Sequence, residues 1–199
     1  MTPETILAAM TALIPPGISP YSAVPEKPGI TCDTAYTKGC RKETEAEGLE
    51  RYQVIAQAIA EVSGGSIAIA AQILSAVLFE SGARRDVHSG QGKFARGDNK
   101  CSWGLGQANI CGGTTRRGWK GEDLTGLDLD STRRSIVTVK DGLARANGYC
   151  RMQAGDASFA CTMSVYGSGK ISMRSHPAIL RRVRSYGRIT MLLSKGNES

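Results

Sequence analysis

A chain of 199 residues is long enough for one compact domain, or for one domain with a modest extension, and its 41% of hydrophobic residues can build a core. The formal net charge of +7 indicates an anionic partner, but it does not separate nucleic acid, a bacterial envelope and an acidic membrane. The basic residues occur as scattered pairs without a zinc-finger or RNA-recognition signature. We therefore expect no specific nucleic-acid partner and interpret most pairs as solvated charge.

The first 42 residues are predicted to form a proline-rich N-terminal arm. Six of the seven prolines precede residue 31, which argues against a long helix and for an extended segment. The chain begins without basic residues and its first apolar run is short, so we predict neither a secretory signal nor a transmembrane segment there. A small cysteine loop ends the arm, and residues 43–199 are expected to form the main domain.

Five helices are predicted from apolar residues that recur every three or four positions, over residues 43–62, 67–79, 131–152, 156–165 and 176–193. The second of them, IAIAAQILSAVLF, is apolar almost all round, which places it in the middle of a core, and Ser66 is expected to cap its start. The glycine-rich segment between residues 82 and 121 shows little periodicity, with short β-structure expected at 102–110. This order indicates a mainly α domain.

The six cysteines fall into three couples that are close in sequence: Cys32 with Cys40, Cys101 with Cys111, and Cys150 with Cys161. The even count and the local spacing favour disulfides, and hence an oxidising destination. Zinc binding is the alternative, but the sequence has no C-x-x-C motif and no Cys/His cluster, so no metal site is predicted.

Glu80 stands at the end of the predicted apolar helix, where the following Ser81 and Gly82 allow the helix to stop. Burial penalises the charged form of a carboxyl group, and the negative end of the helix dipole acts in the same direction. Both effects raise the pKa, as a general acid for cleaving a glycosidic bond requires. Many helices also end in a charged residue, so Glu80 alone does not decide the function.

Two further segments carry groups suited to binding sugars. In residues 103–109, two glycines let the backbone approach a ligand, and Gln107 and Asn109 offer donors and acceptors. Tyr166 offers a ring that can pack against a sugar and a hydroxyl that can make a hydrogen bond. Each segment also has an ordinary interpretation, as a turn or as a packed corner.

Taken in order, Glu80-Ser81, Gly104-Leu105-Gly106-Gln107 and Tyr166-Gly167-Ser168-Gly169 resemble the motifs of lysozyme-like lytic transglycosylases and goose-type lysozymes. The resemblance covers about residues 45–190. It implies a lysozyme-like (α+β) single domain, with a small β or loop insert beside a catalytic cleft for bacterial cell-wall glycan. The chain departs from the family at Gly106, where methionine is frequent, and at Gly167, where asparagine is common. The stretch between the first two motifs is also longer than in most bacterial transglycosylases.

The resemblance also implies a role for each matched residue. Glu80 would be the general acid, and in a transglycosylase also the general base, with Ser81 helping to orient it. The residues that we expect to bind the sugar are Gln107, Asn109, Tyr166 and Trp103.

Asp98 separates two mechanisms. In Gly97-Asp98, shortly before the Gly-Leu turn, it is similar to the second acid of goose-type lysozymes, with Asp86 as another candidate. An inverting hydrolase needs such a carboxylate, about 6.5–9.5 Å from the acid, to activate water. A lytic transglycosylase needs none, and a Gly-Asp-Asn sequence is also a favourable turn.

We therefore predict a bacteriolytic glycosidase that cleaves peptidoglycan between N-acetylmuramic acid and N-acetylglucosamine, as a lytic transglycosylase in preference to a muramidase. A noncatalytic wall-binding or virion structural protein and a basic nucleic-acid-binding domain are the alternatives from other classes. We expect a monomer without metal or organic cofactor, whose partners are glycan strands and the anionic envelope surface. It would act in the periplasm or outside the cell, as a virion-associated enzyme, one released by lysis, or a wall-remodelling enzyme.

Overall fold

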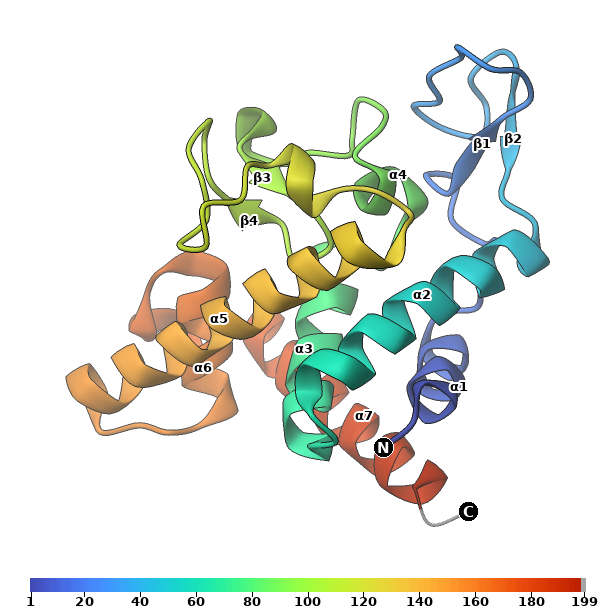
Figure 1. The fold of residues 1–199 in the computed structure, drawn as a ribbon. Helices are drawn as coiled ribbons and strands as arrows, with labels where there is room; N and C mark the ends of the chain where they lie inside the picture. Colours follow the sequence, from blue (N-terminus) through green and yellow to red (C-terminus); the bar gives the residue numbers. More distant parts are fainter. Residues whose placement is uncertain (198–199) are drawn as a thin grey trace.

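The computed structural model describes residues 1–197, and the chain is mainly helical with two small antiparallel sheets (Figure 1). The α-helices are α1 (Pro3–Leu13), α2 (Glu45–Ser63), α3 (Ile67–Glu80), α4 (Arg85–Ser89), α5 (Leu129–Ala154), α6 (Phe159–Ser168) and α7 (Pro177–Gly196). The paired strands are β1 (Ala23–Pro25) with β2 (Cys40–Lys42), and β3 (Ser102–Trp103) with β4 (Ala108–Asn109). The 3-10 helices are η1 (Asp98–Lys100), η2 (Glu122–Leu124) and η3 (Ile171–Ser175). The predicted mainly α class is confirmed.

Capping side chains explain where the helices begin. The Ser66 hydroxyl accepts a hydrogen bond from the N–H of Ile69, as predicted, and α3 begins at the next residue after this cap. The Ser158 hydroxyl accepts from the N–H of Cys161, so α6 begins at Phe159, three residues later than the predicted start. The predicted helices are thus present, with differences of a few residues at their ends.

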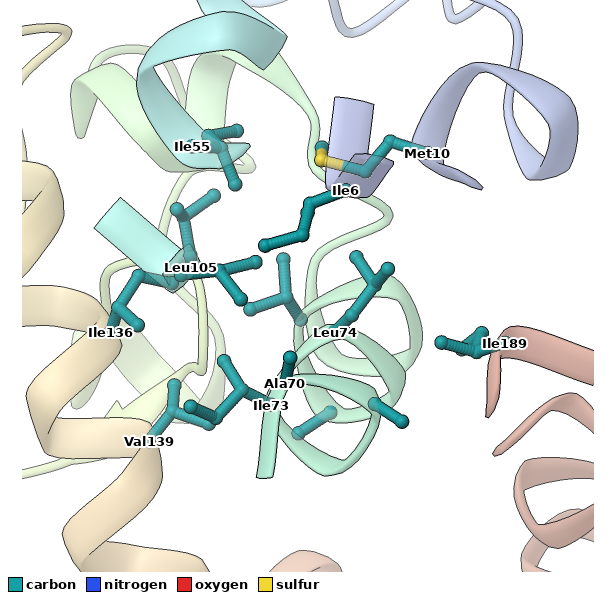
Figure 2. Close-up of a cluster of buried hydrophobic side chains, with 14 of the residues drawn as sticks. Ile6, Met10, Ile55, Ala70, Ile73, Leu74, Leu105, Ile136, Val139 and Ile189 are labelled. Atoms are coloured by element: carbon teal, nitrogen blue, oxygen red, sulfur yellow. The ribbon is translucent and has the colours of Figure 1, made fainter. Parts of the chain in front are cut away.

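Helix α3 occupies the centre of the hydrophobic core (Figure 2). Its Ile73 and Leu74 side chains are fully buried. The surrounding helices contribute Ile55 from α2, Ile136 from α5 and Ile189 from α7, all of them fully buried. As predicted, α3 is apolar on all sides because it lies in the middle of the core. Tight packing around the helix also fixes the position of its C-terminal end.

The N-terminal residues differ from the predicted extended arm, because they form helix α1. Thr2 caps this helix and Pro3 occupies its first turn, where a missing N–H removes no helical hydrogen bond. Ile6 and Met10 are fully buried in the core. The Thr5 hydroxyl donates to the carbonyl of Gly196, which ties α1 to the end of α7.

The irregular part of the arm is confined to residues 14–44, between α1 and α2. It contains the β1–β2 pair and the disulfide between Cys32 and Cys40, and it projects at the opposite end of the molecule from α6 (Figure 1). Tyr21 packs edge-on against Phe94, with ring centroids 5.4 Å apart, so the arm rests on the segment that follows α4. The predicted cysteine loop is present.

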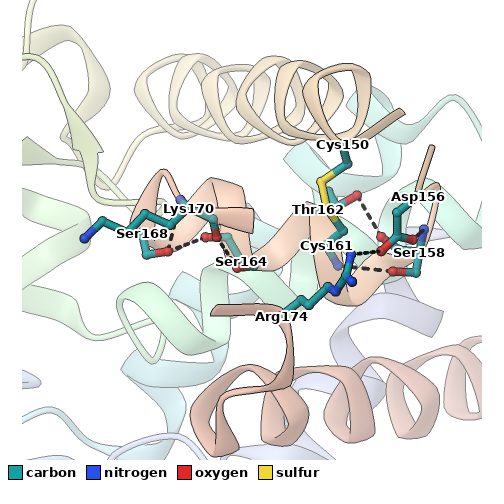
Figure 3. The surroundings of a disulfide bond; sticks show 9 residues. All are labelled: Cys150, Asp156, Ser158, Cys161, Thr162, Ser164, Ser168, Lys170 and Arg174. Carbon is teal, nitrogen blue, oxygen red and sulfur yellow. Dashed lines mark hydrogen bonds and ion pairs between the residues drawn. A yellow bond between two sulfur atoms is a disulfide. The ribbon is translucent and has the colours of Figure 1, made fainter. Parts of the chain in front are cut away.

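The two other predicted cysteine couples also form disulfides. The Cys101–Cys111 disulfide closes the segment that contains β3 and β4, which is the small β insert predicted at residues 102–110. The Cys150–Cys161 disulfide joins the end of α5 to the start of α6 (Figure 3). Within residues 1–197 no cysteine is left free.

No helix within the described residues is long and apolar enough to cross a membrane. The predicted main domain, residues 43–199, ends in Glu198 and Ser199, which lie outside the described residues. Helices α2 to α7 belong to this main domain, and α1 joins their core from the predicted arm.

Candidate active site

A cleft with a volume of about 1330 Å³ lies beside the β3–β4 insert. Three parts of the chain line it together with Glu80: residues within 97–117, one face of α5 between Thr138 and Met152, and the end of α6 from Val165 to Gly169. The end of α6 is held in place by Ser168, whose hydroxyl donates to the carbonyl of Ser164 at 2.7 Å (Figure 3). The cleft brings together segments that are far apart in sequence.

Glu80 is the last residue of α3, and its side chain is 19% exposed to the cleft. Burial raises the pKa of the Glu80 carboxyl above its ordinary value, and the negative charge of Asp98 acts in the same direction. Arg182 opposes this rise through its charge and a hydrogen bond, but the pKa stays raised. The Glu80 carboxyl therefore keeps its proton to a higher pH than an ordinary glutamate does.

Arg182 is the closest charged partner of Glu80. Its Nη1 donates to Oε1 of Glu80 at 2.6 Å, and its guanidinium group also lies 5.3 Å from the centre of the Phe79 ring. Gly167 makes this approach possible, because a Cβ atom there would lie 2.6 Å from Nη1 of Arg182 and 3.5 Å from Oε1 of Glu80. The absence of a side chain at Gly167 therefore leaves the space that the Arg182 guanidinium group occupies.

The sequence reasoning missed Arg182 because it placed this residue outside the inward face of α7. The inward face that we predicted consisted of Ile179, Val183, Tyr186, Thr190 and Leu193. Ile179 and Leu193 are buried as predicted and Tyr186 packs against the core, whereas Val183 and Thr190 are half-buried and Ile189 is buried in addition. Arg182 lies three residues after Ile179 and four before Tyr186, so the spacing of the apolar residues did not exclude it from the inward face.

Asp98 lines the same cleft as Glu80. Its Oδ2 accepts from the Ser102 hydroxyl at 3.0 Å and from Nδ2 of Asn109 at 3.5 Å, which fixes the carboxylate. The backbone φ angles of Asp98, Asn99 and Lys100 are 47°, 54° and 71°, a left-handed run that side chains other than glycine adopt at a cost. The structure therefore brings Asp98 and Glu80 to one site, whereas Asp86 is held by Arg84 away from the residues that line the cleft.

Gln107 also lines the cleft, but its amide group is occupied by the backbone. Its Oε1 accepts from the N–H of Gly97 at 3.0 Å, and its Nε2 donates to the carbonyls of Ala95 and Gly104 at 3.3 and 3.2 Å. These three bonds hold the strand-flanking loop in shape. Gln107 positions the cleft wall, and the amide of Asn109 lies beside it in the same wall.

Tyr166 packs into the side of the cleft, where Gly106 and Gly142 leave room for its side chain. Its hydroxyl donates to the carbonyl of Gly106 at 3.1 Å, and a Cβ atom at Gly106 would meet Val139 at 2.3 Å. A Cβ atom at Gly142 would meet the Tyr166 ring at 2.7 Å. Burial raises the pKa of the Tyr166 phenol, so it remains a neutral donor. Val139 and the Tyr166 hydroxyl therefore leave no room for a side chain at Gly106.

Two predicted site residues, Ser81 and Trp103, do not line the cleft. The Ser81 hydroxyl donates to the carbonyl of Val77 at 2.9 Å and accepts from the N–H of Ala83 at 3.2 Å, so it stabilises the end of α3. Trp103 borders a smaller pocket of about 370 Å³. Its ring is covered by the Arg96 guanidinium at 4.5 Å and by the backbone of Gly121, where a Cβ atom would lie 2.2 Å from the ring. Protein groups therefore occupy the ring surface that a sugar would need.

The sequence reasoning also missed the residues that α5 contributes to the cleft. Tyr149 and Met152 are 43% and 77% exposed there, and Arg145 lies on the same face. Their positions at spacings of three and four on the polar side of a predicted helix were the available signal. Arg117 enters the cleft from the loop after β4 and forms a bidentate ion pair with Asp141 of α5.

No protein-family model, curated protein or solved structure matches this chain. Among residues 1–197, no group of three or more histidine, cysteine, aspartate or glutamate side chains is arranged to hold a metal ion. The chain has a mainly helical fold with three disulfides. Its long cleft has Glu80, the last residue of the buried helix α3, in the wall.

Proposed function

We propose that this protein is a lysozyme-like enzyme that cleaves peptidoglycan glycan strands as a lytic transglycosylase, with Glu80 as general acid and base. The observation that carries the proposal is the position of Glu80, which ends the central apolar helix, lines the large cleft and has a raised pKa. The order of the three short motifs along the chain supports the same class.

The proposed reaction needs one carboxyl group. Protonated Glu80 gives its proton to the glycosidic oxygen as the bond from that oxygen to C1 of the muramyl residue breaks. The acetamido oxygen of the substrate stabilises the positive charge at C1. The Glu80 carboxylate then takes the proton of the 6-hydroxyl, whose oxygen bonds to C1. The products are a free glycan end and a 1,6-anhydro-muramyl end, no water is consumed, and Glu80 is protonated again.

The shape of the cleft suits a chain-like substrate. The face of α5 that lines it runs from Thr138 to Met152, about 21 Å at 1.5 Å per residue, so several sugars can lie along it. Exposed Tyr149 and Met152 on this face offer apolar surface for sugar rings. An extended cleft of this kind favours a polymer over a small molecule.

Asp98 supports a second candidate, a goose-type muramidase that hydrolyses the same bond. Its carboxylate lines the cleft, and its charge acts on Glu80. An Asp98 carboxylate that activates water would give reducing muramyl ends. A noncatalytic wall-binding or virion structural protein is the candidate from another class, and the cleft-lining Glu80 argues against it. The three disulfides suit a setting in the periplasm or outside the cell.

Mass spectrometry of the soluble products from purified peptidoglycan tests these proposals. Wild type should give anhydro-muramyl ends, and Glu80→Gln should lose at least about 100-fold in rate while its circular dichroism is unchanged. Glu50→Gln, an exposed glutamate outside the cleft, is the matched control and should stay active. Reducing ends that disappear in Asp98→Asn would establish the muramidase instead. If wild type gives no products, both enzymatic proposals fail.

A further inference from the structure

Some of the charged groups in the cleft have no partner of opposite charge within residues 1–197. Glu80 is paired with Arg182, and Asp141 is paired with Arg117. Two of the arginines that line the cleft, Arg116 and Arg145, are exposed, and neither makes a hydrogen bond, an ion pair or a ring contact within residues 1–197. Cationic groups without a protein partner therefore face the space in which the substrate would lie.

Arg145 is the better placed of these two arginines. It projects from α5 over Gly142, and its Nη2 lies 3.9 Å from the position that a Cβ atom of Gly142 would occupy. The Tyr166 ring lies 2.7 Å from that same position. Tyr166 precedes Gly167, which is in contact range of Glu80. Arg145 is therefore in the part of the cleft wall that leads to the proposed general acid.

The chemistry of the guanidinium group indicates the ligand. Its planar set of N–H donors matches a carboxylate, which can accept two hydrogen bonds from it at once. Neutral sugar hydroxyls gain no such charge-assisted pair. Glu80 and Asp141 already have arginine partners, and the Asp98 carboxylate is held by Ser102 and Asn109, so Arg145 is left without a protein carboxylate and can pair with one from the ligand.

We propose that Arg145 binds a carboxylate carried by the glycan, and so makes the enzyme select acidic cell-wall glycan over neutral chitin-like chains. This inference rests on the proposed function. Peptidoglycan offers two sources of the group: the lactyl carboxylate of muramyl residues without a peptide, and the carboxylates of the peptide stem. Arg145 takes no part in the bond cleavage, and its contribution is to affinity and substrate choice.

Calorimetric titration of the Glu80→Gln protein, which binds without cleaving, tests the inference with three ligands of equal length. They are neutral N-acetylglucosamine oligomers, peptide-free glycan and peptide-bearing glycan. Adding Arg145→Gln should weaken binding of the carboxylate-bearing ligand by about tenfold and leave the neutral oligomer unchanged. Arg151→Gln removes the same charge from the same helix outside the cleft, and it should change neither affinity.

The outcomes distinguish the two possible sources of the carboxylate, and they distinguish failure of the Arg145 inference from failure of the proposed function. Loss for peptide-free glycan assigns the lactyl carboxylate, and loss for peptide-bearing glycan alone assigns the stem. Equal affinity for acidic and neutral ligands, or a preference that survives Arg145→Gln, overturns the Arg145 inference while glycan binding itself stands. Absence of binding to all three ligands, in a protein that is folded by circular dichroism, overturns both the inference and the proposed function.

Discussion

Arg182 and Glu80 meet across helices α7 and α3, with Nη1 of the arginine 2.6 Å from Oε1 of the glutamate. Both side chains are largely buried, at 17% and 19% exposure. Burial pushes the pKa of Glu80 up and Arg182 pulls it down, and burial is the larger influence. The protonation of the proposed general acid is therefore a balance between two opposing effects.

Removing the arginine should shift this balance in one direction. A general acid loses activity as pH rises through its pKa, and Arg182 stabilises the ionised form. Arg182→Gln should therefore raise the pKa of Glu80 and move the basic limb of the kcat/KM profile to higher pH. Arg182→Lys keeps the charge and should keep the limb closer to wild type. An unshifted limb in an active, folded Arg182→Gln protein would contradict the proposed effect of Arg182.

Gly167→Ala should disturb the same pair without removing either charge. The new Cβ atom would lie 2.6 Å from Nη1 of Arg182, so the guanidinium group must move away from Glu80. We expect the basic limb of the pH profile to move in the same direction as in Arg182→Gln, with activity reduced about tenfold. Gly187→Ala, on α7 with open space around it, is the control and should leave the profile unchanged. Equal behaviour of the two alanine variants would argue against a tight fit at Gly167.

His88 should make the protein sensitive to acid. It is buried, and its Nε2 lies 2.6 Å from the Thr132 hydroxyl. Burial, with the charges of Arg51 and Arg85, lowers its pKa from 6.5 to about 3. Between these values the unfolded chain binds the proton and the folded chain does not, so the free energy of unfolding falls as the pH falls.

Urea denaturation at several pH values measures this effect. Each pH unit below 6.5 should remove up to about 1.4 kcal/mol of stability until the pH approaches 3. His88→Gln lacks the titrating ring and should show a flatter dependence over this range. His176→Gln removes the exposed histidine and is the control. Parallel pH dependences for wild type and His88→Gln would refute the prediction.

The three disulfides should differ in their resistance to reduction. Cys150 and Cys161 are fully buried, whereas Cys111 is exposed. Because thiol exchange needs access to a sulfur atom, mild reductant should open Cys101–Cys111 before Cys150–Cys161. Alkylation followed by mass spectrometry gives the order, and simultaneous loss of both bonds would show that access does not control it. Opening each bond should lower the free energy of unfolding by about 2–3 kcal/mol.

Local sequence features accounted for much of the fold. The apolar run of α3 and the hydroxyl of Ser66 were enough to place the central helix and its start, because both depend on neighbouring residues. Proline content misled the prediction for α1, since Pro3 sits in a first turn that tolerates it. The local spacing of the cysteines correctly gave all three disulfides.

The sequence by itself determined the helical class, the central position of α3, the cysteine pairs and the placement of Glu80 at a helix end. Only the tertiary structure decided which polar groups are available to a ligand. Gln107 is bound by three backbone groups, Trp103 is covered, and Arg182 turns inward to Glu80. The physical reason is that helix formation and capping depend on residues within a turn or two, whereas the partner of a side chain in a cleft comes from segments as distant as α3 and α7.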